Sequence, residues 1–494
     1  MHLDHHMSFV DDVKAHPLSI KPAGNAFTAA SASTLRASTG ALGRLTDKLI
    51  LQVLDYLEDI DLQCLGSTCK VFYAFSTFEE LWKNLFIERH VDLTSLKWRG
   101  TWRNTLLKHR APSSSSVSCN GIYSDLLYRP FHCAHISLAR YVTSIPPRNA
   151  IQRVSDLSHA EYVAEFAKKP FILTSPVGDW PLFHKWSLDA LQEEYGNVVF
   201  RAEAVDWSLE NYLNYLRNND DESPLYLFDR YFVEKMKLRT DEDTDDGTKD
   251  GTDGTMQDYW PPKCFGDDLF AVLGDQRPAF RWLIVGGERS GSTFHKDPNA
   301  TSAWNAVLQG SKYWIMFPPS ETAPPPPGVY VSEDHSEVTS PLSIAEWLLG
   351  FHAAARMSPG CKEGICGEGE MLHVPSGWWH LVINLEPTIA ITQNFVPAVH
   401  LSAVLHFLRD KPQQVSGFNA KQVMNPHQLF VNELEAKHPD VLKQALRTLD
   451  SLQGRKRKWD EVVHNNIITN GRDGGGFSFN FSGGDDENGI DDEA

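Results

Sequence analysis

The chain has 494 residues, 41% of them hydrophobic, which is enough for two or three domains with a substantial core. Its 46 lysines and arginines against 64 aspartates and glutamates give a net charge of −18, so direct nucleic-acid binding is not expected. Seven cysteines, an odd number, argue against a disulfide scaffold, and no apolar stretch approaches the ~18 residues of a membrane span. We therefore expect a soluble intracellular protein.

The N-terminal part of the chain divides at about residue 40. Residues 1–40 are rich in small and polar residues, so we expect them to be disordered. From residue 41 to residue 90, apolar residues recur at helical spacing, as in the stripe formed by Leu45, Leu49, Val53 and Leu57. This spacing predicts a small all-α unit of three short amphipathic helices. Residues 91–148, which contain the serine-rich stretch 111–118, are interpreted as a linker with connecting helices.

Residues 149–400 are dominated by short β-rich runs separated by glycine and proline turns, such as FRWLIVGG, SKYWIMFPP and TIAITQNFV. Many short strands of this kind predict an antiparallel sandwich or barrel, so the fold class is α+β. The acidic, glycine-punctuated segment 239–258 is interpreted as a surface insertion. Residues 401–453 return to helical spacing. Residues 454–494 are predicted to be disordered, with Arg455–Lys458 as a nuclear import signal or an ordinary solvated charge run.

A histidine followed two residues later by a carboxylate is a possible half of a metal site. Chance alone predicts roughly three such pairs in a chain of this composition. The sequence contains six: His2/Asp4, His90/Asp92, His159/Glu161, His295/Asp297, His335/Glu337 and His438/Asp440. Only His295/Asp297, in SGSTFHKDPN, lies in a β-rich run, where residues i and i+2 of a strand point to the same face. Context rather than the motif selects this pair.

A third ligand is available in GEMLHVPSGWWHLVINL, where His380 begins a predicted strand 85 residues after His295. Two histidines and one carboxylate are the ligands of non-haem Fe(II) oxygenases, which keep other positions open for co-substrate and oxygen. Such an enzyme also needs a cation for the distal carboxylate of 2-oxoglutarate. Lys312 lies in the next predicted strand, and Thr392 shares a strand face with Asn394, so both are candidates for this contact.

The stretches RWLIVGGERSGSTFHKDPNATSAWNAVLQGSKYWIMFPP and GEMLHVPSGWWHLVINLEPTIAITQNF resemble the JmjC family of Fe(II)- and 2-oxoglutarate-dependent oxygenases. The resemblance is to the branch once called phosphatidylserine receptor, a lysyl hydroxylase and proposed arginine demethylase, and covers residues 151–410. It implies a double-stranded β-helix, the cupin-like jelly roll, with flanking helices. It further implies His295, Asp297 and His380 as iron ligands, and Lys312, Thr392, Asn305 and Ser292 as 2-oxoglutarate contacts.

The implied reaction uses O2 to convert 2-oxoglutarate to succinate and carbon dioxide while a substrate C–H bond is hydroxylated. On an N-methyl group the hydroxylated product would release formaldehyde, so hydroxylase and histone or arginine demethylase activities remain equally open. The substrate is expected to be a protein, with a histone or an RNA-associated protein as candidates. A nuclear location, with the cytoplasm as an alternative, and a homodimer through the C-terminal helices also stay open.

The stretch LGRLTDKLILQVLDYLEDIDLQCLGSTCKVFYAFSTFEELWKNLF resembles an F-box, with Thr46 where that family usually has proline. The resemblance implies docking to a Skp-type adaptor of a cullin-type ubiquitin ligase, with Leu49, Leu54 and Trp82 as candidate determinants. An alternative function follows from it: a non-catalytic substrate receptor whose barrel only binds clients.

Three further interpretations concern residues around the site. Trp378 and Trp379 are expected to fill the core rather than to contact substrate. Cys361 and Cys366, in CKEGIC, are either ordinary buried thiols or half of a zinc site. Lys296, between two expected ligands, should point away from the metal.

Overall fold

The computed structural model describes residues 14–28, 34–88, 96–108, 117–240, 257–319, 324–332, 338–339 and 342–451. The core of the predicted acidic insertion, the pairs at His2, His90 and His335, the predicted disordered tail and the candidate import signal lie outside these residues. Part of the stretch 1–40, predicted to be disordered, is packed on the folded chain. Ile20 is buried and Lys21 forms a β-bridge with Tyr123, so residues 14–28 pack on the folded chain.

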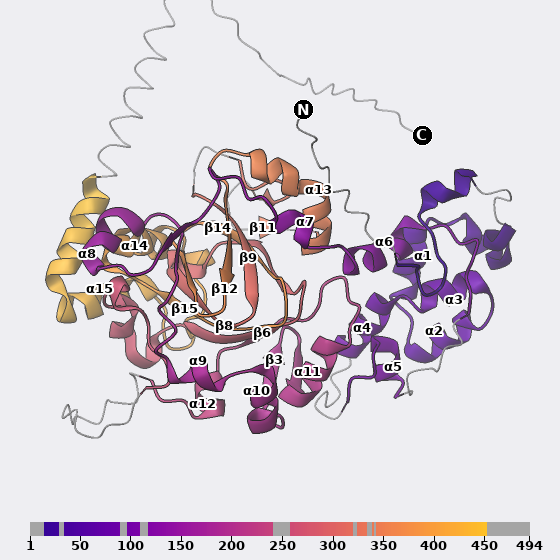
Figure 1. Cartoon of the computed structure of the whole chain (residues 1–494), viewed down its shortest axis with the longest axis horizontal. Helices are drawn as coiled ribbons and strands as arrows, with labels where there is room; N and C mark the ends of the chain where they lie inside the picture. Colours follow the sequence, from indigo (N-terminus) through magenta and orange to yellow (C-terminus); the bar gives the residue numbers. More distant parts are fainter. Residues whose placement is uncertain are drawn as a thin grey trace, which may run out of the picture.

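The centre of the molecule is a jelly roll built from two sheets around a common interior (Figure 1). The larger sheet has the strand order β1-β2-β13-β8-β15-β6-β5-β3-β4, and the smaller sheet the order β12-β9-β14-β7. All pairs are antiparallel except β1 with β2. The predicted α+β jelly roll is confirmed. The larger sheet comprises β1 (Gln152–Val154), β2 (Phe171–Leu173), β3 (Val199–Ala202), β4 (Val205–Ser208), β5 (Leu227–Asp229), β6 (Arg281–Gly286), β8 (Ser302–Gln309), β13 (Met371–Val374) and β15 (Thr388–Phe395). The smaller sheet comprises β7 (Gly291–His295), β9 (Ser311–Phe317), β12 (Lys362–Gly367) and β14 (Trp379–Asn384), and β10 (Tyr330–Val331) pairs separately with β11 (Val338–Thr339).

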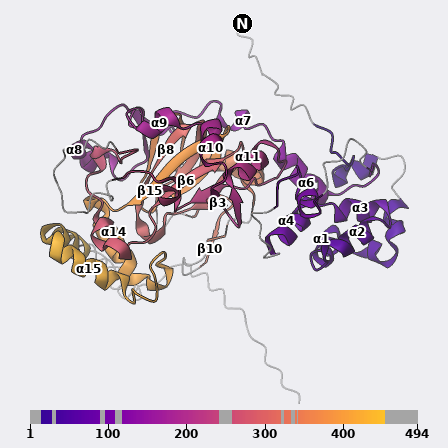
Figure 2. The same ribbon diagram turned by 90° about the horizontal axis from the view of Figure 1, so that it is seen from below.

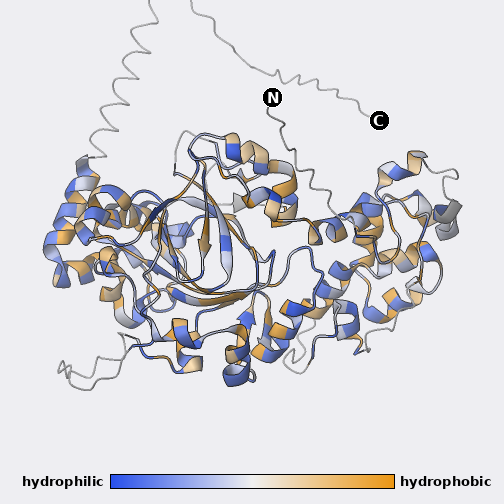
Figure 3. Cartoon of the chain, viewed as in Figure 1, coloured by the Kyte–Doolittle hydropathy of each residue, from blue (hydrophilic) through white to orange (hydrophobic). Residues whose placement is uncertain are grey.

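The central strands are buried on both faces because helices cover the outside of the sheets (Figure 3). All six residues of β14 are buried, which accounts for its nearly continuous apolar sequence. Helix α13 (Ile344–Met357) packs Trp347 and Leu348 against the smaller sheet. The other helices around the barrel are α6 (Asp125–Ala134), α7 (Ala139–Val142), α8 (His159–Glu161), α9 (Pro181–Lys185), α10 (Leu188–Tyr195), α11 (Leu209–Arg217) and α12 (Phe232–Met236).

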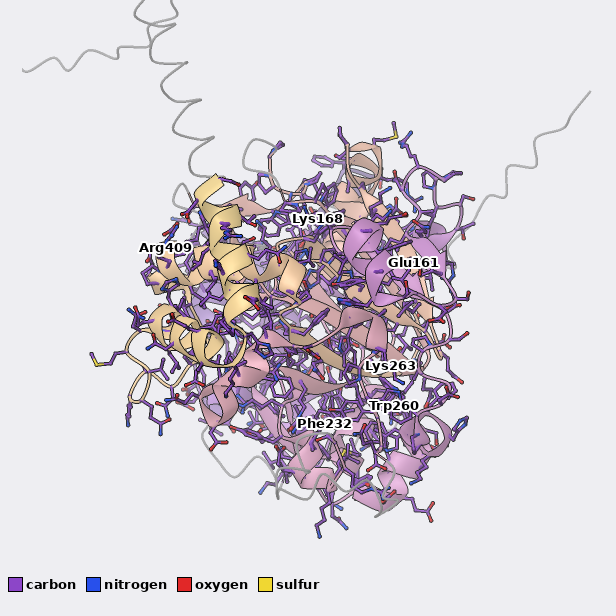
Figure 4. All side chains as sticks on the ribbon, turned by 90° about the vertical axis from the view of Figure 1, so that its left-hand side faces the viewer. Glu161, Lys168, Phe232, Trp260, Lys263 and Arg409 are labelled. Carbon is purple, nitrogen blue, oxygen red and sulfur yellow. The ribbon has the colours of Figure 1, made fainter. Side chains whose placement is uncertain are left out.

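The C-terminal helices lie on the side of the barrel opposite the N-terminal helical unit (Figures 1 and 2). Helices α14 (Leu401–Asp410) and α15 (Pro426–Lys437), the helical residues 439–451 and the 3-10 helix Leu269–Gln276 share one apolar cluster. Figure 4 shows this end face on, with the exposed Arg409 on α14. None of the helices in the described part of the chain is both long and apolar enough to cross a membrane.

The N-terminal unit contains four helices where the sequence predicted three. They are α1 (Asp47–Leu54), α2 (Asp59–Gly66), α3 (Lys70–Ser76) and α4 (Glu79–Glu88). The expected middle helix is split because Cys69 has extended backbone angles and α3 restarts after it. Thr46, the departure from the F-box pattern, caps α1 by accepting a hydrogen bond from the Leu49 amide. A threonine N-cap contributes about 1 kcal/mol, so the missing proline is compensated locally.

Residues 96–106 join the N-terminal unit to the barrel as a buried junction rather than as a linker. Trp98 precedes α5 (Trp102–Leu106), and Trp102 is its first residue. Both rings lie between Phe86 of α4 and the barrel residues Trp207 and Tyr215. Ring centroids within this junction cluster are 4.8–6.3 Å apart. One hydrophobic core therefore runs from the helical unit into the barrel, and of the predicted linker and connecting helices these residues form a buried connecting helix.

Candidate metal and co-substrate site

Three side chains predicted from the sequence converge at one end of the jelly roll. The ligand-type atoms of His295, Asp297 and His380 all lie within 4.8 Å of one another. His295 ends β7 and His380 lies directly opposite it on β14, with ring centroids 4.1 Å apart. Strand pairing thus brings together two histidines that are far apart in the sequence. No other group of three such side chains with this spacing occurs among the residues that the structure describes.

Asp297 reaches the site by a different route from the one predicted. Strand β7 ends at His295, and Asp297 precedes the short turn Pro298–Ala300 instead of sharing a strand face. Proline cannot continue the strand pairing, which explains the early end. The turn is held in place by Asn299, which donates to the Ser416 carbonyl and accepts from the Ser416 amide. A turn, fixed by the segment after α14, therefore positions the carboxylate.

Both histidines present the same ring nitrogen to the centre of the group. Nδ1 of His295 lies 2.8 Å from the Thr293 carbonyl, and Nδ1 of His380 lies 3.1 Å from the Trp378 carbonyl. A carbonyl can only accept, so each Nδ1 carries the proton and donates it. Nε2 of each ring is left as a lone-pair donor, which is the arrangement usual for metal-bound histidine.

The carboxylate of Asp297 fits a cation. Its Oδ2 atom is buried and has no hydrogen-bond partner, an arrangement that is costly unless a positive group completes it. Burial raises the pKa of Asp297 to about 6, against the opposing effects of His295 and of a hydrogen bond from Asn394. Burial and the charge of His295 lower the pKa of His380 well below its usual value, so that ring is neutral. Two imidazoles and one carboxylate form a donor set that suits Fe(II).

Lys312 of β9 is completely buried and lies opposite Asn384 of β14, the strand that also carries His380. Its Nζ donates to the hydroxyl of Tyr226 at 2.6 Å and to Oδ1 of Asn384 at 3.1 Å. An ammonium group has three N–H donors, so these contacts leave one. Burial lowers the pKa of Lys312 to about 7. A buried amine with an unused donor is suited to an anionic ligand, which would restore its charge.

A cavity of about 340 Å³ connects the metal-binding residues with the surroundings of Lys312. Its lining includes Ser292, Asn305 and Thr392, the other predicted co-substrate contacts, together with Tyr226. Oδ1 of Asn305 is buried without a partner, and the Thr392 hydroxyl donates to the Trp304 carbonyl at 2.9 Å. Rotation about one C–O bond would redirect the threonine hydroxyl hydrogen. Asn305 and Thr392 face each other across β8 and β15, so strand register sets their spacing.

Sequence reasoning missed the two side chains that hold Lys312. Tyr226 precedes β5 and Asn384 ends β14, so both come from parts of the chain remote from β9. The available signal was the lysine itself, because a lysine inside a buried strand requires polar partners. The asparagine in HLVINL, at the end of an otherwise apolar run, was the most visible candidate.

The neighbouring residues resolve the smaller open questions. Trp378 and Trp379 are each only 7% exposed and belong to the core, as expected for packing residues. Cys361 and Cys366 lie in two different apolar clusters, and neither belongs to a group of metal-ligand side chains among the described residues, which favours ordinary buried thiols. Lys296 is exposed, with Nζ 4.5 Å from the centre of the Trp379 ring.

Comparison with known proteins gives the same picture. Residues 156–400 match the cupin-like domain family and residues 47–88 the F-box-like family. The chain is 37% identical over 439 residues to the arginine-specific demethylase JMJ22 of Arabidopsis thaliana, covering 86% of this chain and 82% of that protein.

It is also 33% identical over 317 residues to the bifunctional arginine demethylase and lysyl-hydroxylase psr-1 of Caenorhabditis elegans, covering 61% of this chain and 72% of that protein. A 165-residue stretch, 32% of this chain and 36% of the relative, is 30% identical to the 2-oxoglutarate and iron-dependent oxygenase JMJD4 of Danio rerio. The chain therefore belongs to the JmjC family of Fe(II)- and 2-oxoglutarate-dependent oxygenases, in the phosphatidylserine-receptor-like branch, and combines that domain with an F-box-like unit.

Proposed function

We propose that this oxygenase acts on a lysine or arginine side chain of a protein, by hydroxylation or by removal of an N-methyl group. The observation that carries the proposal is one small cavity that is lined by His295, Asp297 and His380 and by Tyr226, the tyrosine whose hydroxyl accepts a hydrogen bond from buried Lys312. The names of JMJ22 and psr-1 support arginine and lysine as the targets.

The protein contributes binding, orientation and exclusion of water. His295, Asp297 and His380 would hold iron, which with 2-oxoglutarate and O2 would supply the oxidising power that breaks a substrate C–H bond. Lys312 would bind the distal carboxylate of 2-oxoglutarate, with Thr392 as a second donor. The apolar lining residues Ile284, Trp314 and Val382 keep this charge pair out of bulk water and so strengthen it.

The test is to compare wild type with His295→Ala in two measurements. We expect the wild-type protein, loaded with Fe(II), to convert 2-oxoglutarate to succinate, and the variant to fall to background. Mass spectrometry of proteins from cells carrying each form should show a modified lysine or arginine that depends on His295. A wild-type protein with intact iron and no turnover, together with unchanged modification in cells, would instead favour a non-catalytic substrate receptor.

We also propose that the F-box-like unit docks a Skp-type adaptor and, through it, a cullin-type ubiquitin ligase. An apolar face formed by Leu49, Val53, Tyr56 and Ile60 supports this proposal. These side chains are 47–90% exposed, although other apolar residues of the unit, such as Ile50 and Phe86, are buried in the shared core. Leu54 and Trp82, two of the three candidates taken from the sequence, are at most 2% exposed and belong to that core instead. Helix-in-groove docking uses an exposed stripe of this kind.

Removing two side chains of this apolar face should weaken adaptor binding without unfolding the protein. For the double variant Tyr56→Ala/Ile60→Ala we expect the Kd for a Skp-type adaptor to rise by roughly thirtyfold, the effect of losing one interface hot spot. Thermal unfolding should be nearly unchanged, because both side chains are already exposed. Leu54→Ala is the contrasting variant and should lower Tm by several degrees. Unchanged adaptor affinity in the double variant would exclude this face.

Two further expectations stay predictions. Nuclear localisation would depend on the basic residues 455–458, beyond the described part of the chain. Dimerisation through the C-terminal helices would have to use residues that remain exposed, such as Leu446 and, in the loop before α15, Met424, because Phe430, Leu434 and Leu442 are already buried within the chain.

A further inference from the structure

Lys83, on helix α4 of the F-box-like unit, is buried against a loop of the oxygenase domain. Its Nζ donates to the Ser223 carbonyl at 3.3 Å and lies 3.9 Å from Oδ2 of Asp221. The residue is only 9% exposed. A buried ammonium is stable only with such partners, so the contact fixes both the lysine and the loop. Helices α4, α5 and α11 meet around this contact (Figures 1 and 2).

Asp221 connects the same loop to the junction cluster through hydrogen bonds. Its carboxylate accepts hydrogen bonds from Trp102 Nε1 at 2.9 Å and from the Tyr215 hydroxyl at 2.6 Å. Trp102 comes from the segment after the F-box-like unit, and Tyr215 from α11 of the oxygenase domain. Asp221 is therefore held from three directions, by α4, α5 and α11, and the loop 219–224 has little freedom to move.

This loop forms one wall of a second cavity, of about 440 Å³, whose lining includes the metal-binding residue His295. Glu222, Ser223 and Pro224 lie on one side of it, and the segment 289–293 with His295 on the other. Ser292 and His295 also line the smaller co-substrate cavity, so the two spaces adjoin. The loop that Lys83 fixes thus forms a wall of a space large enough for a side chain beside the metal ligands.

A chain of hydrogen bonds continues from this loop to Lys312. The Arg289 guanidinium donates to the Asp221 carbonyl at 2.8 Å, and the Arg289 amide donates to the Asn384 carbonyl at 2.9 Å. Asn384 in turn accepts from Lys312 through Oδ1. Arg289 has a φ of 71°, a conformation that costs a non-glycine residue energy and persists where surrounding contacts impose it.

We propose that the F-box-like unit contributes, through Lys83, to 2-oxoglutarate binding by the oxygenase domain. Lys83 is a positioning residue: it holds Asp221 and Ser223, which shape the cavity beside the metal ligands, and through Arg289 and Asn384 it fixes the orientation of Lys312. The inference rests on the proposed co-substrate role of Lys312. A unit attached only as a tether for a ligase would leave 2-oxoglutarate binding independent of Lys83.

The test uses the full-length chain and measures binding as well as turnover. For Lys83→Met we expect the Kd for 2-oxoglutarate, measured in the presence of Mn²⁺ so that no turnover occurs, to rise about fivefold, which corresponds to about 1 kcal/mol. The rate at saturating 2-oxoglutarate should change less than twofold, because Lys83 touches no reacting group. Lys83→Arg should restore the affinity. The exposed Lys48, on α1, provides the matched control in Lys48→Met, which should behave as wild type.

If Lys83→Met does not fold, Arg289→Lys carries the same expectation, since a lysine keeps the charge but cannot reproduce the guanidinium contact. Folded variants with a Kd within twofold of wild type would overturn the inference and leave Lys83 a structural residue. Loss of turnover in wild type with normal 2-oxoglutarate binding would instead count against the proposed activity, so the two failures are distinguishable.

Discussion

Replacement of Asp297 by alanine is expected to abolish turnover and to lower the affinity for Fe(II) by more than about a hundredfold. Two neutral imidazoles would remain, and neither can offset the charge of the cation. The alanine variant lacks the carboxylate with its buried, unpartnered Oδ2 atom, and with it the negative charge that would face the cation. Metal content after dialysis, together with succinate formation, measures both effects.

Lys296→Ala is the matched control, because Lys296 is the immediate neighbour of two ligands yet lies exposed against Trp379. Its metal affinity should stay within about twofold of wild type, the range usual for exposed substitutions. Equal loss of metal in both variants would mean that the backbone of the turn, rather than the carboxylate, governs binding.

Replacement of Lys312 by methionine is expected to raise the Kd for 2-oxoglutarate by roughly a hundredfold, or about 3 kcal/mol, because a carboxylate would then be buried without its cation. The iron affinity should change little, since Lys312 is not among the three metal-binding side chains. Titration of metal-loaded protein with 2-oxoglutarate separates the two affinities. Undiminished 2-oxoglutarate binding would remove Lys312 from the co-substrate site.

The pH dependence of binding supplies a second readout for the same residue. Burial lowers the pKa of Lys312 to about 7, so the amine is charged below that pH and neutral above it. The carboxylate of 2-oxoglutarate binds the charged form, and binding above pH 7 must therefore take up a proton. The Kd in wild type should rise with pH above about 7, approaching tenfold per unit, and Lys312→Met should lose this slope.

Much of the site could be predicted from the sequence because its chemistry is carried by residue types in strand context. His295, His380 and Lys312 each lie in a β-rich run, where a polar residue stands out against apolar neighbours. The route of Asp297 could not be predicted, because the strand ends at His295, two residues earlier than the alternation suggests, and a turn that begins with Pro298 follows.

The junction between the two units could not be predicted from the sequence either. Trp98 and Trp102 lie in no clear periodic pattern, and their partners Trp207 and Tyr215 are more than a hundred residues away. Local periodicity reports which face of an element is apolar and says nothing about which distant surface covers it. For the same reason Tyr226 and Asn384 became visible only as partners of Lys312.

The shared core has a consequence for how the protein folds. Two domains with separate cores unfold independently, whereas in the junction cluster the ring of Trp102, from the helical segment, lies nearly parallel to that of Trp207, from the barrel, with centroids 5.8 Å apart. Opening either unit alone would expose several large aromatic rings to water at once. The helical unit and the jelly roll should therefore melt as one cooperative unit, and neither is a separable module that recombination could exchange without rebuilding the other.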